Sequence, residues 1–182
     1  MVGLFDSGRG GLNTVRHVRA AGDVDLVYLI DRENSPYGIK TEKEIIDITK
    51  RNIERLSDMG AERVLIACCT ASTVYDKLGG EYKEKAIPII DAVAKAAKNS
   101  TRSGRIGVIA TKRTVDSHAF RRVLSGYRTY EVATGELVGL IDGGLSDMTV
   151  TTADEARLEE MLTPVLTKDI DTLILGCTHF PP

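Results

Sequence analysis

Short apolar, β-branched runs alternate along the chain with segments in which apolar residues recur at helical spacing. Runs of this length between turn residues are typical of strands buried on both faces of a sheet. We predict strands at 2–5, 26–30, 63–67, 87–90, 105–110, 127–132 and 172–175.

The clearest helical segment begins after Thr41, where Glu44 completes a capping box, and it ends at Gly60. Its apolar face carries Ile45, Ile48, Ile53 and Leu56. We predict further helices at 12–20, 92–98, 115–124 and 153–166. Strands that alternate with crossover helices indicate an α/β fold of parallel sheets covered by helices on both faces.

The polar, turn-rich segment 98–104 is the best internal boundary. We predict two similar α/β lobes, 1–97 and 98–182, with the final segment 171–182 packing at the lobe junction. Each lobe carries a cysteine directly after an apolar strand, Cys68 in the first and Cys177 in the second. Ligands of open parallel sheets bind outside the carboxyl ends of the strands, so we expect both thiols where chemistry takes place.

Composition excludes several classes of partner. The 24 basic and 26 acidic residues nearly balance, no basic block stands out and Trp is absent, which disfavours nucleic acid. No apolar run approaches the length of about 20 residues that spans a membrane, and the N-terminus does not resemble a signal peptide. We therefore expect a cytoplasmic protein without a membrane partner, in a compartment that keeps thiols reduced.

Three cysteines, Cys68, Cys69 and Cys177, do not form a disulfide framework. A zinc site that also used His179 is disfavoured, because adjacent cysteines fit one tetrahedral ion poorly and no C-x2-C pair exists. We expect no metal. Packing as a small buried hydrophobe remains an alternative for each cysteine taken alone.

The context of two cysteines favours chemistry. Thr70 follows the Cys68-Cys69 pair and Thr178 follows Cys177, and we expect both cysteines at helix starts, where the pKa of a thiol is lowered. His179 can stabilise the Cys177 thiolate, although a packed core histidine is an alternative. We interpret the other histidines, His17 and His118, as surface residues on helices.

The glycine-rich turn from Asp6 to Gly11 follows the first strand and opens a helix. Such a turn can direct backbone N–H groups at an anion, although Asp6 as a simple helix cap is an alternative. Asn13 occupies the third glycine position of a dinucleotide fingerprint, which excludes that motif. Hydroxyls that cluster after strands could bind a carboxylate or merely cap helices: Thr70, Ser72, Thr111 and Thr114.

Five motifs together resemble the successive signatures of glutamate racemases. They are Asp6-Ser-Gly-Arg-Gly-Gly-Leu12, Pro36-Tyr-Gly38, Ala67-Cys-Cys-Thr-Ala-Ser72, Gly107-Val-Ile-Ala-Thr111 and Leu175-Gly-Cys-Thr-His-Phe-Pro181. The chain also resembles aspartate racemases, but these usually carry an acidic residue at the position of His179 and lack the Asp-Ser-Gly opening. Glutamate is therefore the expected substrate.

The resemblance implies an active site in the cleft between the lobes, with Cys68 and Cys177 on opposite faces of the amino acid. One thiolate removes the α-proton and the other thiol returns a proton, without any cofactor. The resemblance also implies that Asp6 supports Cys68, and that His179 and Asp142 support Cys177.

The resemblance further assigns the substrate-binding positions. They are Asp6, Ser7, Pro36, Tyr37, Gly38, Cys69, Thr70, Ser72, Thr111, Thr178 and His179. A homodimer that supplies D-glutamate for peptidoglycan, and hence for cell-wall biogenesis and cell shape, is the implied biological setting.

Two departures from the family pattern leave alternatives open. Cys69 stands where the family has Asn, which weakens hydrogen bonding to substrate. The chain ends at Pro182, so we expect a truncated form with apolar sheet surface exposed. The alternatives are an impaired homologue that only binds an amino acid, an aspartate racemase-like enzyme, and a thiol hydrolase that uses Cys177 with His179.

Overall fold

Each predicted apolar run contains a strand, and every strand pairs in parallel with its neighbours. The strand predicted at 87–90 is the exception in length, since it ends at Pro88 and a helix begins at Ile89. The computed structural model describes residues 1–142 and 151–181 of the chain. Its strands are β1 (Val2–Asp6), β2 (Leu26–Ile30), β3 (Arg63–Ile66), β4 (Ala86–Pro88), β5 (Arg105–Ala110), β6 (Arg128–Ala133) and β7 (Thr172–Gly176).

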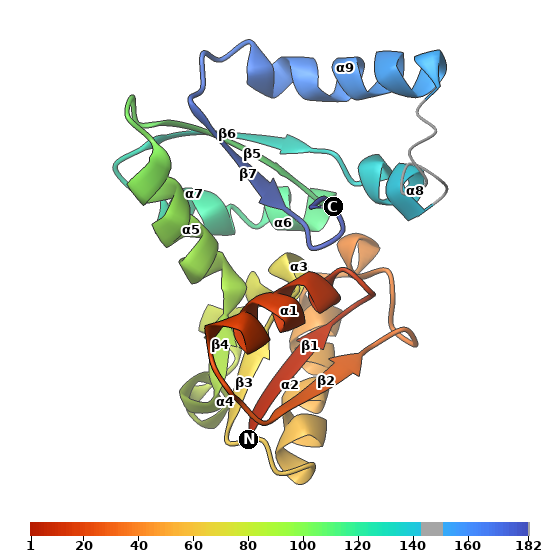
Figure 1. Cartoon of the computed structure of the whole chain (residues 1–182), viewed down its shortest axis with the longest axis vertical. Coiled ribbons are helices and arrows are strands. Elements are labelled where there is room, and N and C mark those ends of the chain that lie inside the picture. The colour runs from red at the N-terminus through yellow and green to blue at the C-terminus, as the bar shows by residue number, and fades with distance from the viewer. Residues whose placement is uncertain (143–150, 182) are drawn as a thin grey trace. The chain divides into compact units, whose positions relative to one another are not determined.

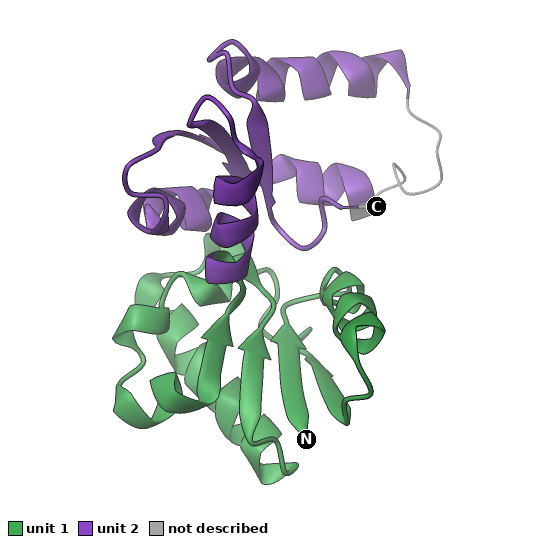
Figure 2. Cartoon of the chain, turned by 60° about the vertical axis from the view of Figure 1, so that its left-hand side comes forward, with its two compact units in different colours: residues 1–90 green, residues 91–182 purple. Residues whose placement is uncertain are grey.

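The described residues divide into two units, Met1–Ile90 and Asp91–Pro182, which Figure 2 shows in different colours. Each unit contains one parallel sheet: β2-β1-β3-β4 in the first and β6-β5-β7 in the second. The predicted α/β fold class of two parallel-sheet units is therefore confirmed.

The first unit carries its helices on both faces of the sheet (Figure 1). The helices are α1 (Gly11–Ala21), η1 (Tyr37–Ile39), α2 (Glu42–Asp58), α3 (Cys69–Ser72), η2 (Tyr75–Lys77) and α4 (Gly80–Lys85). Helix α2 has the predicted capping box of Thr41 and Glu44. It ends before Gly60, whose φ of +94° suits glycine. Its apolar face packs with β1 and β3 into the core of this unit.

The second unit contains α6 (Lys112–Asp116), α7 (Ala119–Val123), α8 (Glu136–Asp142) and α9 (Thr152–Leu166), and α5 (Ile89–Ser100) begins at the boundary between the units. The prediction of a single helix at 115–124 is wrong, because the helix is interrupted between α6 and α7. His118 adopts a left-handed conformation with φ of 53° there. The Ser117 hydroxyl bonds Thr114 O and Ala119 N, and so competes with regular helical hydrogen bonding.

Within each sheet, successive strands are added first on one side of the first strand and then on the other. The chain passes from β1 through α1 to β2 at one edge, and then through α2 to β3 on the other side of β1. Because parallel crossovers are right-handed, the two connections cover opposite faces. Gly3 accordingly lies against Leu56 of α2, whereas Asp6 lies against Gly11 of α1.

The second unit repeats this arrangement, with β6 and β7 on either side of β5. Gly107 approaches Val165 of α9, and Gly176 approaches Phe120 of α7 on the other face. The helices of the described residues include none that is long and apolar enough to cross a membrane.

The core of the first unit supplies a stability test. Ile66 on β3 is fully buried, whereas Ile87 on the neighbouring strand β4 is 41% exposed. We expect Ile66→Ala to lower the free energy of unfolding by about 2–5 kcal/mol, because it leaves a cavity in packed core. Ile87→Ala is the matched control and should lose much less. Urea unfolding measures both, and equal losses would contradict the assignment of the core.

Candidate active site

The candidate site of the first unit lies beyond the carboxyl ends of β1 and β3. Asp6 ends β1 and is fully buried. Its Oδ2 accepts a hydrogen bond of 2.8 Å from the backbone N–H of Gly11, the first residue of α1. This contact is of the helix-capping kind and folds the glycine-rich turn back on Asp6.

Tyr28 fixes the same turn from β2. Its hydroxyl donates to the carbonyl of Gly8 at 2.8 Å. A Cβ atom on Gly11 would lie 2.5 Å from the Tyr28 hydroxyl and 2.7 Å from Asp6 Cβ, so only glycine fits there. The turn is therefore held by close packing as well as by hydrogen bonds.

Cys68 follows β3 and precedes the short helix α3, as the sequence predicts. Its side chain is almost completely buried, yet its Sγ lies 3.8 Å from the hydroxyl of Ser7. Burial raises the pKa of Tyr28, and the negative charges of Asp6 and Cys68 raise it further. The structure thus brings Asp6, Ser7 and Cys68 together at one edge of the sheet.

The predicted substrate segment Pro36–Gly38 enters η1 through a cis Ser35–Pro36 peptide. The Tyr37 side chain is buried, with its hydroxyl 2.6 Å from Asp31 Oδ2. Burial raises the pKa of Tyr37, and its hydrogen bond to Asp31 and the charge of Cys68 raise it further. The Tyr37 ring is thus part of the core of the first unit.

Sequence reasoning missed Asp31. It is buried and accepts side-chain hydrogen bonds from Asn34, Tyr37 and Asn52. These bonds lower its pKa against the opposing effect of burial. The sequence does contain a signal for Asp31, namely an aspartate directly after an apolar strand and shortly before a Pro-Tyr-Gly turn.

Three other predicted binding residues lie next to Cys68. Cys69 and Thr70 open α3 and are nearly buried. Ser72 has a structural role, because its hydroxyl donates to Ile66 O at 3.1 Å and accepts from Ile89 N at 3.2 Å. That hydroxyl ties the end of β3 to the start of α5.

Cys177 of the second unit follows β7 at its carboxyl end. Its Sγ lies 3.7 Å from Nδ1 of His179. The expectation of a helix start after Cys177 is wrong for the described residues. Phe180 N instead bonds Cys177 O at 3.2 Å and closes a tight turn, which places the imidazole beside the thiol.

Three further predicted site residues belong to the second unit. Thr111 follows β5 and caps α6, with its hydroxyl 3.3 Å from Thr114 N and 2.9 Å from Thr114 Oγ1. Thr178 is partly exposed. Asp142 is the last residue of α8, and its side chain lies outside the described part of the structure.

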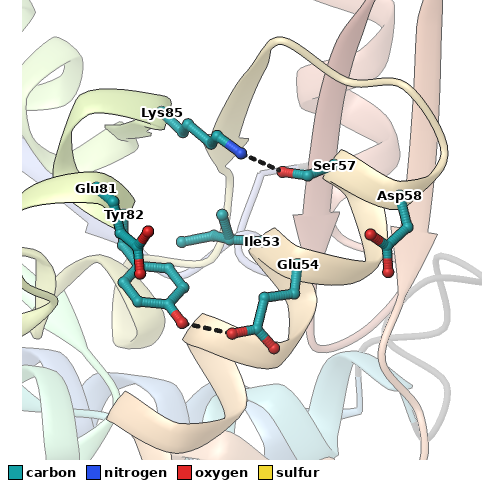
Figure 3. A pocket seen from close by; sticks show the side chains of 7 residues that line it. All are labelled: Ile53, Glu54, Ser57, Asp58, Glu81, Tyr82 and Lys85. Atoms are coloured by element: carbon teal, nitrogen blue, oxygen red, sulfur yellow. Dashed lines mark hydrogen bonds between the residues drawn. The ribbon is translucent and has the colours of Figure 1, made fainter.

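A cavity of about 250 Å³ between α2 and α4 contains neither thiol. Figure 3 shows Tyr82 directed at Glu54 and Lys85 directed at Ser57, in agreement with their hydrogen bonds. None of the predicted site residues lines this cavity, so we do not place the chemistry there. Within the described ranges, no three His, Cys, Asp or Glu side chains gather as the ligands of a metal ion would.

Two parallel-sheet α/β units, each with a cysteine at a strand end beside a polar side chain, are the setting in which the comparisons with known proteins place a racemase. Residues 12–182 match the model of the Asp/Glu/hydantoin racemase family. The chain belongs to this family, and the resemblance found in its motifs is confirmed.

Two relatives illustrate the similarity. The glutamate racemase of Desulforudis audaxviator is 38% identical over 99% of this chain and 67% of its own length. The glutamate racemase of Gloeobacter violaceus is 36% identical over 100% of this chain and 69% of its own length.

Solved structures agree in fold. A glutamate racemase isoform from Bacillus anthracis superposes with a TM-score of 0.89 at 29% identity, covering 100% of this chain and 69% of that one. The Francisella tularensis glutamate racemase, solved in complex with D-glutamate, gives 0.87 at 30% identity, covering 99% and 69%.

The close fit around Gly11 is testable. We expect Gly11→Ala to cost about 1–3 kcal/mol in the free energy of unfolding, because the new methyl group overpacks the turn between Tyr28 and Asp6. Gly22→Ala is the control, since no atom lies within 4 Å of a Cβ there. Urea titration compares the two variants. A neutral Gly11→Ala would show that the turn is loosely packed.

The lowered pKa of Asp31 predicts a pH dependence. A carboxylate with a lowered folded pKa adds stability above its unfolded pKa of about 4, and this stability is lost as pH falls towards the folded pKa. We expect Tyr37→Phe to destabilise the protein by about 1–3 kcal/mol at neutral pH. The deficit should shrink as acid protonates Asp31. Urea unfolding across this pH range tests it, and a deficit independent of pH would contradict it.

Proposed function

We propose that this protein interconverts L- and D-glutamate without a cofactor, with Cys68 and Cys177 as the two acid/base groups. The observation that carries the proposal is the pairing in each unit of a strand-end thiol with a polar side chain. Ser7 lies 3.8 Å from one sulfur and His179 lies 3.7 Å from the other. The choice of glutamate as substrate rests on the relatives, which are named glutamate racemases.

Inversion at the α-carbon needs a proton acceptor on one face and a proton donor on the other. The Cys68 thiolate removes the α-proton and becomes a thiol, and the Cys177 thiol gives its proton to the opposite face and becomes a thiolate. The reverse reaction exchanges these roles. Thiols suit this task because their ordinary pKa of about 8.5 lies near neutral pH.

The carbanion formed in between must be stabilised without an electron sink such as pyridoxal phosphate. Preorganised hydrogen-bond donors in a site that excludes water supply that stabilisation. In the first unit, Asp6 and Ser7 flank Cys68. In the second unit His179 adjoins Cys177, and we assign Asp142 to assist it.

Substrate binding uses the remaining predicted positions. The main chain of Pro36, Tyr37 and Gly38 holds a carboxylate, and Cys69 and Thr70 at the start of α3 face the amino acid. Thr111, Thr178 and His179 contribute from the second unit. Cys69 bonds the substrate more weakly than an amide side chain would, so we expect a higher KM rather than a different reaction.

The wider setting is part of the same proposal. A cytoplasmic enzyme keeps both thiols reduced, and D-glutamate is a precursor of bacterial peptidoglycan. We propose a homodimer, which sedimentation of the purified protein tests.

The short distance between Cys177 and His179 is also what a thiol hydrolase would need. That alternative assigns no function to Cys68 or to its contact with Ser7. It predicts a covalent acyl-enzyme with activated esters, whereas a racemase forms no such adduct.

Replacement of either thiol tests the proposal. Cys68→Ser and Cys177→Ser keep the size of the side chain but remove a base that ionises near neutral pH. We expect each to slow racemisation of both enantiomers by about 10²–10⁴-fold, the usual contribution of one acid/base group. Chiral chromatography of glutamate follows the reaction.

The control is Tyr82→Phe, in the cavity between α2 and α4, which should leave turnover unchanged. Full activity in either cysteine variant, with native circular dichroism, would end the two-thiol proposal.

A further inference from the structure

Asp31 is a buried carboxylate directly after β2. Only 2% of its surface is exposed. Its backbone N–H donates to the carbonyl of Asp6 at 2.9 Å, which continues the pairing of β2 with β1. The main chain of Asp31 is therefore anchored beside the residue that ends β1 at the candidate site.

The side chain of Asp31 accepts hydrogen bonds from three side chains in two segments of the chain. Asn34 donates to Oδ1 and Oδ2 from its amide nitrogen at 2.8 and 3.0 Å, and its backbone N–H lies 3.3 Å from Oδ1. Tyr37 donates its hydroxyl to Oδ2 at 2.6 Å. Asn52 of α2 donates to Oδ2 at 3.1 Å and to the Tyr37 hydroxyl at 3.0 Å.

This arrangement couples the charge of Asp31 to one conformation of the chain. A buried carboxylate is costly unless donors surround it. Two of its three donor side chains, Asn34 and Tyr37, belong to the segment that leads into and forms η1. Unfolding of that segment would leave the charge without them, so the carboxylate favours the folded segment.

The third donor, Asn52, connects this segment to helix α2. Asn52 is 2% exposed and lies on α2, a helix of 17 residues that packs against the sheet. Because its amide bonds both Asp31 and Tyr37, it holds the Tyr37 ring against a rigid element. Because Tyr37 lies between Pro36 and Gly38 in the chain, the position of its ring constrains the main chain of both residues.

We propose that Asp31 is a positioning residue that holds Pro36–Gly38, through Tyr37 and Asn52, in the conformation that binds the substrate carboxylate. This inference rests on the proposed function, which gives that segment its contact with glutamate. Asp31 itself touches no substrate and takes no part in proton transfer.

A purely structural role for this network would lower stability without changing substrate affinity. The positioning role requires a selective loss of binding, in which KM rises while kcat stays nearly constant. Two variants remove different donors without adding a charge. Tyr37→Phe removes the hydroxyl, and Asn52→Ala removes the amide from α2, outside the segment.

The control is Tyr75→Phe. The Tyr75 hydroxyl donates to Lys83 O at 3.2 Å, and its ring packs against the same core. This variant therefore loses a tyrosine hydrogen bond in the first unit but leaves the Asp31 network intact.

The experiment measures backbone amide exchange over residues 32–40, and KM and kcat for L-glutamate, in the full chain. We expect Tyr37→Phe and Asn52→Ala to speed exchange in this segment and to raise KM about 10-fold, the size of one lost hydrogen bond to a charged group. Both variants should keep kcat within about two-fold of wild type, because the thiols are untouched. Tyr75→Phe should change neither exchange there nor KM.

Unchanged exchange, or faster exchange with unchanged KM, would overturn the positioning role. A fall in kcat at constant KM would also overturn it. A wild-type protein that binds L-glutamate by calorimetry but does not racemise it would instead refute the proposed function. In that case the dissociation constants for L-glutamate test the positioning role, which requires weaker binding by Tyr37→Phe and Asn52→Ala than by wild type. A wild-type protein that binds no glutamate overturns the positioning role as well.

Discussion

The site depends on one constraint, which is that each parallel sheet first adds a strand on one side of its first strand and then continues on the other side. Connections from β1 and β3 leave on opposite faces, and the region beyond the carboxyl ends of two such neighbouring strands is where open parallel sheets bind ligands. Asp6, Ser7 and Cys68 lie there. The same arrangement of β5 and β7 brings together the strand ends that carry Thr111 and Cys177. Two short units therefore each present a thiol and hydroxyl groups through topology alone.

The two units support their thiols differently. In the first, the buried carboxylates of Asp6 and Asp31 and the partly buried Tyr28 hold the loops through hydrogen bonds and through packing that only Gly11 allows. In the second, a tight turn sets His179 beside Cys177. A base within a preorganised surround keeps its geometry during proton transfer.

Much of this could be predicted from the sequence, because the strands of parallel sheets form nearly continuous apolar runs. The capping box at Thr41 and the strand-end positions of both cysteines followed from local rules alone. Other features depend on tertiary contacts. The break at His118 arises from hydrogen bonds of Ser117, and the role of Asp31 from donors up to 21 residues away. The hydrogen bonds of Ser72 to Ile66 and Ile89 could not be predicted either, because a hydroxyl after a strand has the same local pattern whether it binds a ligand or the backbone.

The central claim, proton removal on one face and delivery on the other, is tested most directly by racemisation of L-glutamate in deuterium oxide. Mass spectrometry of both enantiomers at early conversion measures the isotope at the α-carbon. With two separate thiols, the D-glutamate formed carries deuterium while the remaining L-glutamate carries none. D-glutamate that retains the original proton would show a single group acting on both faces, and would contradict the account.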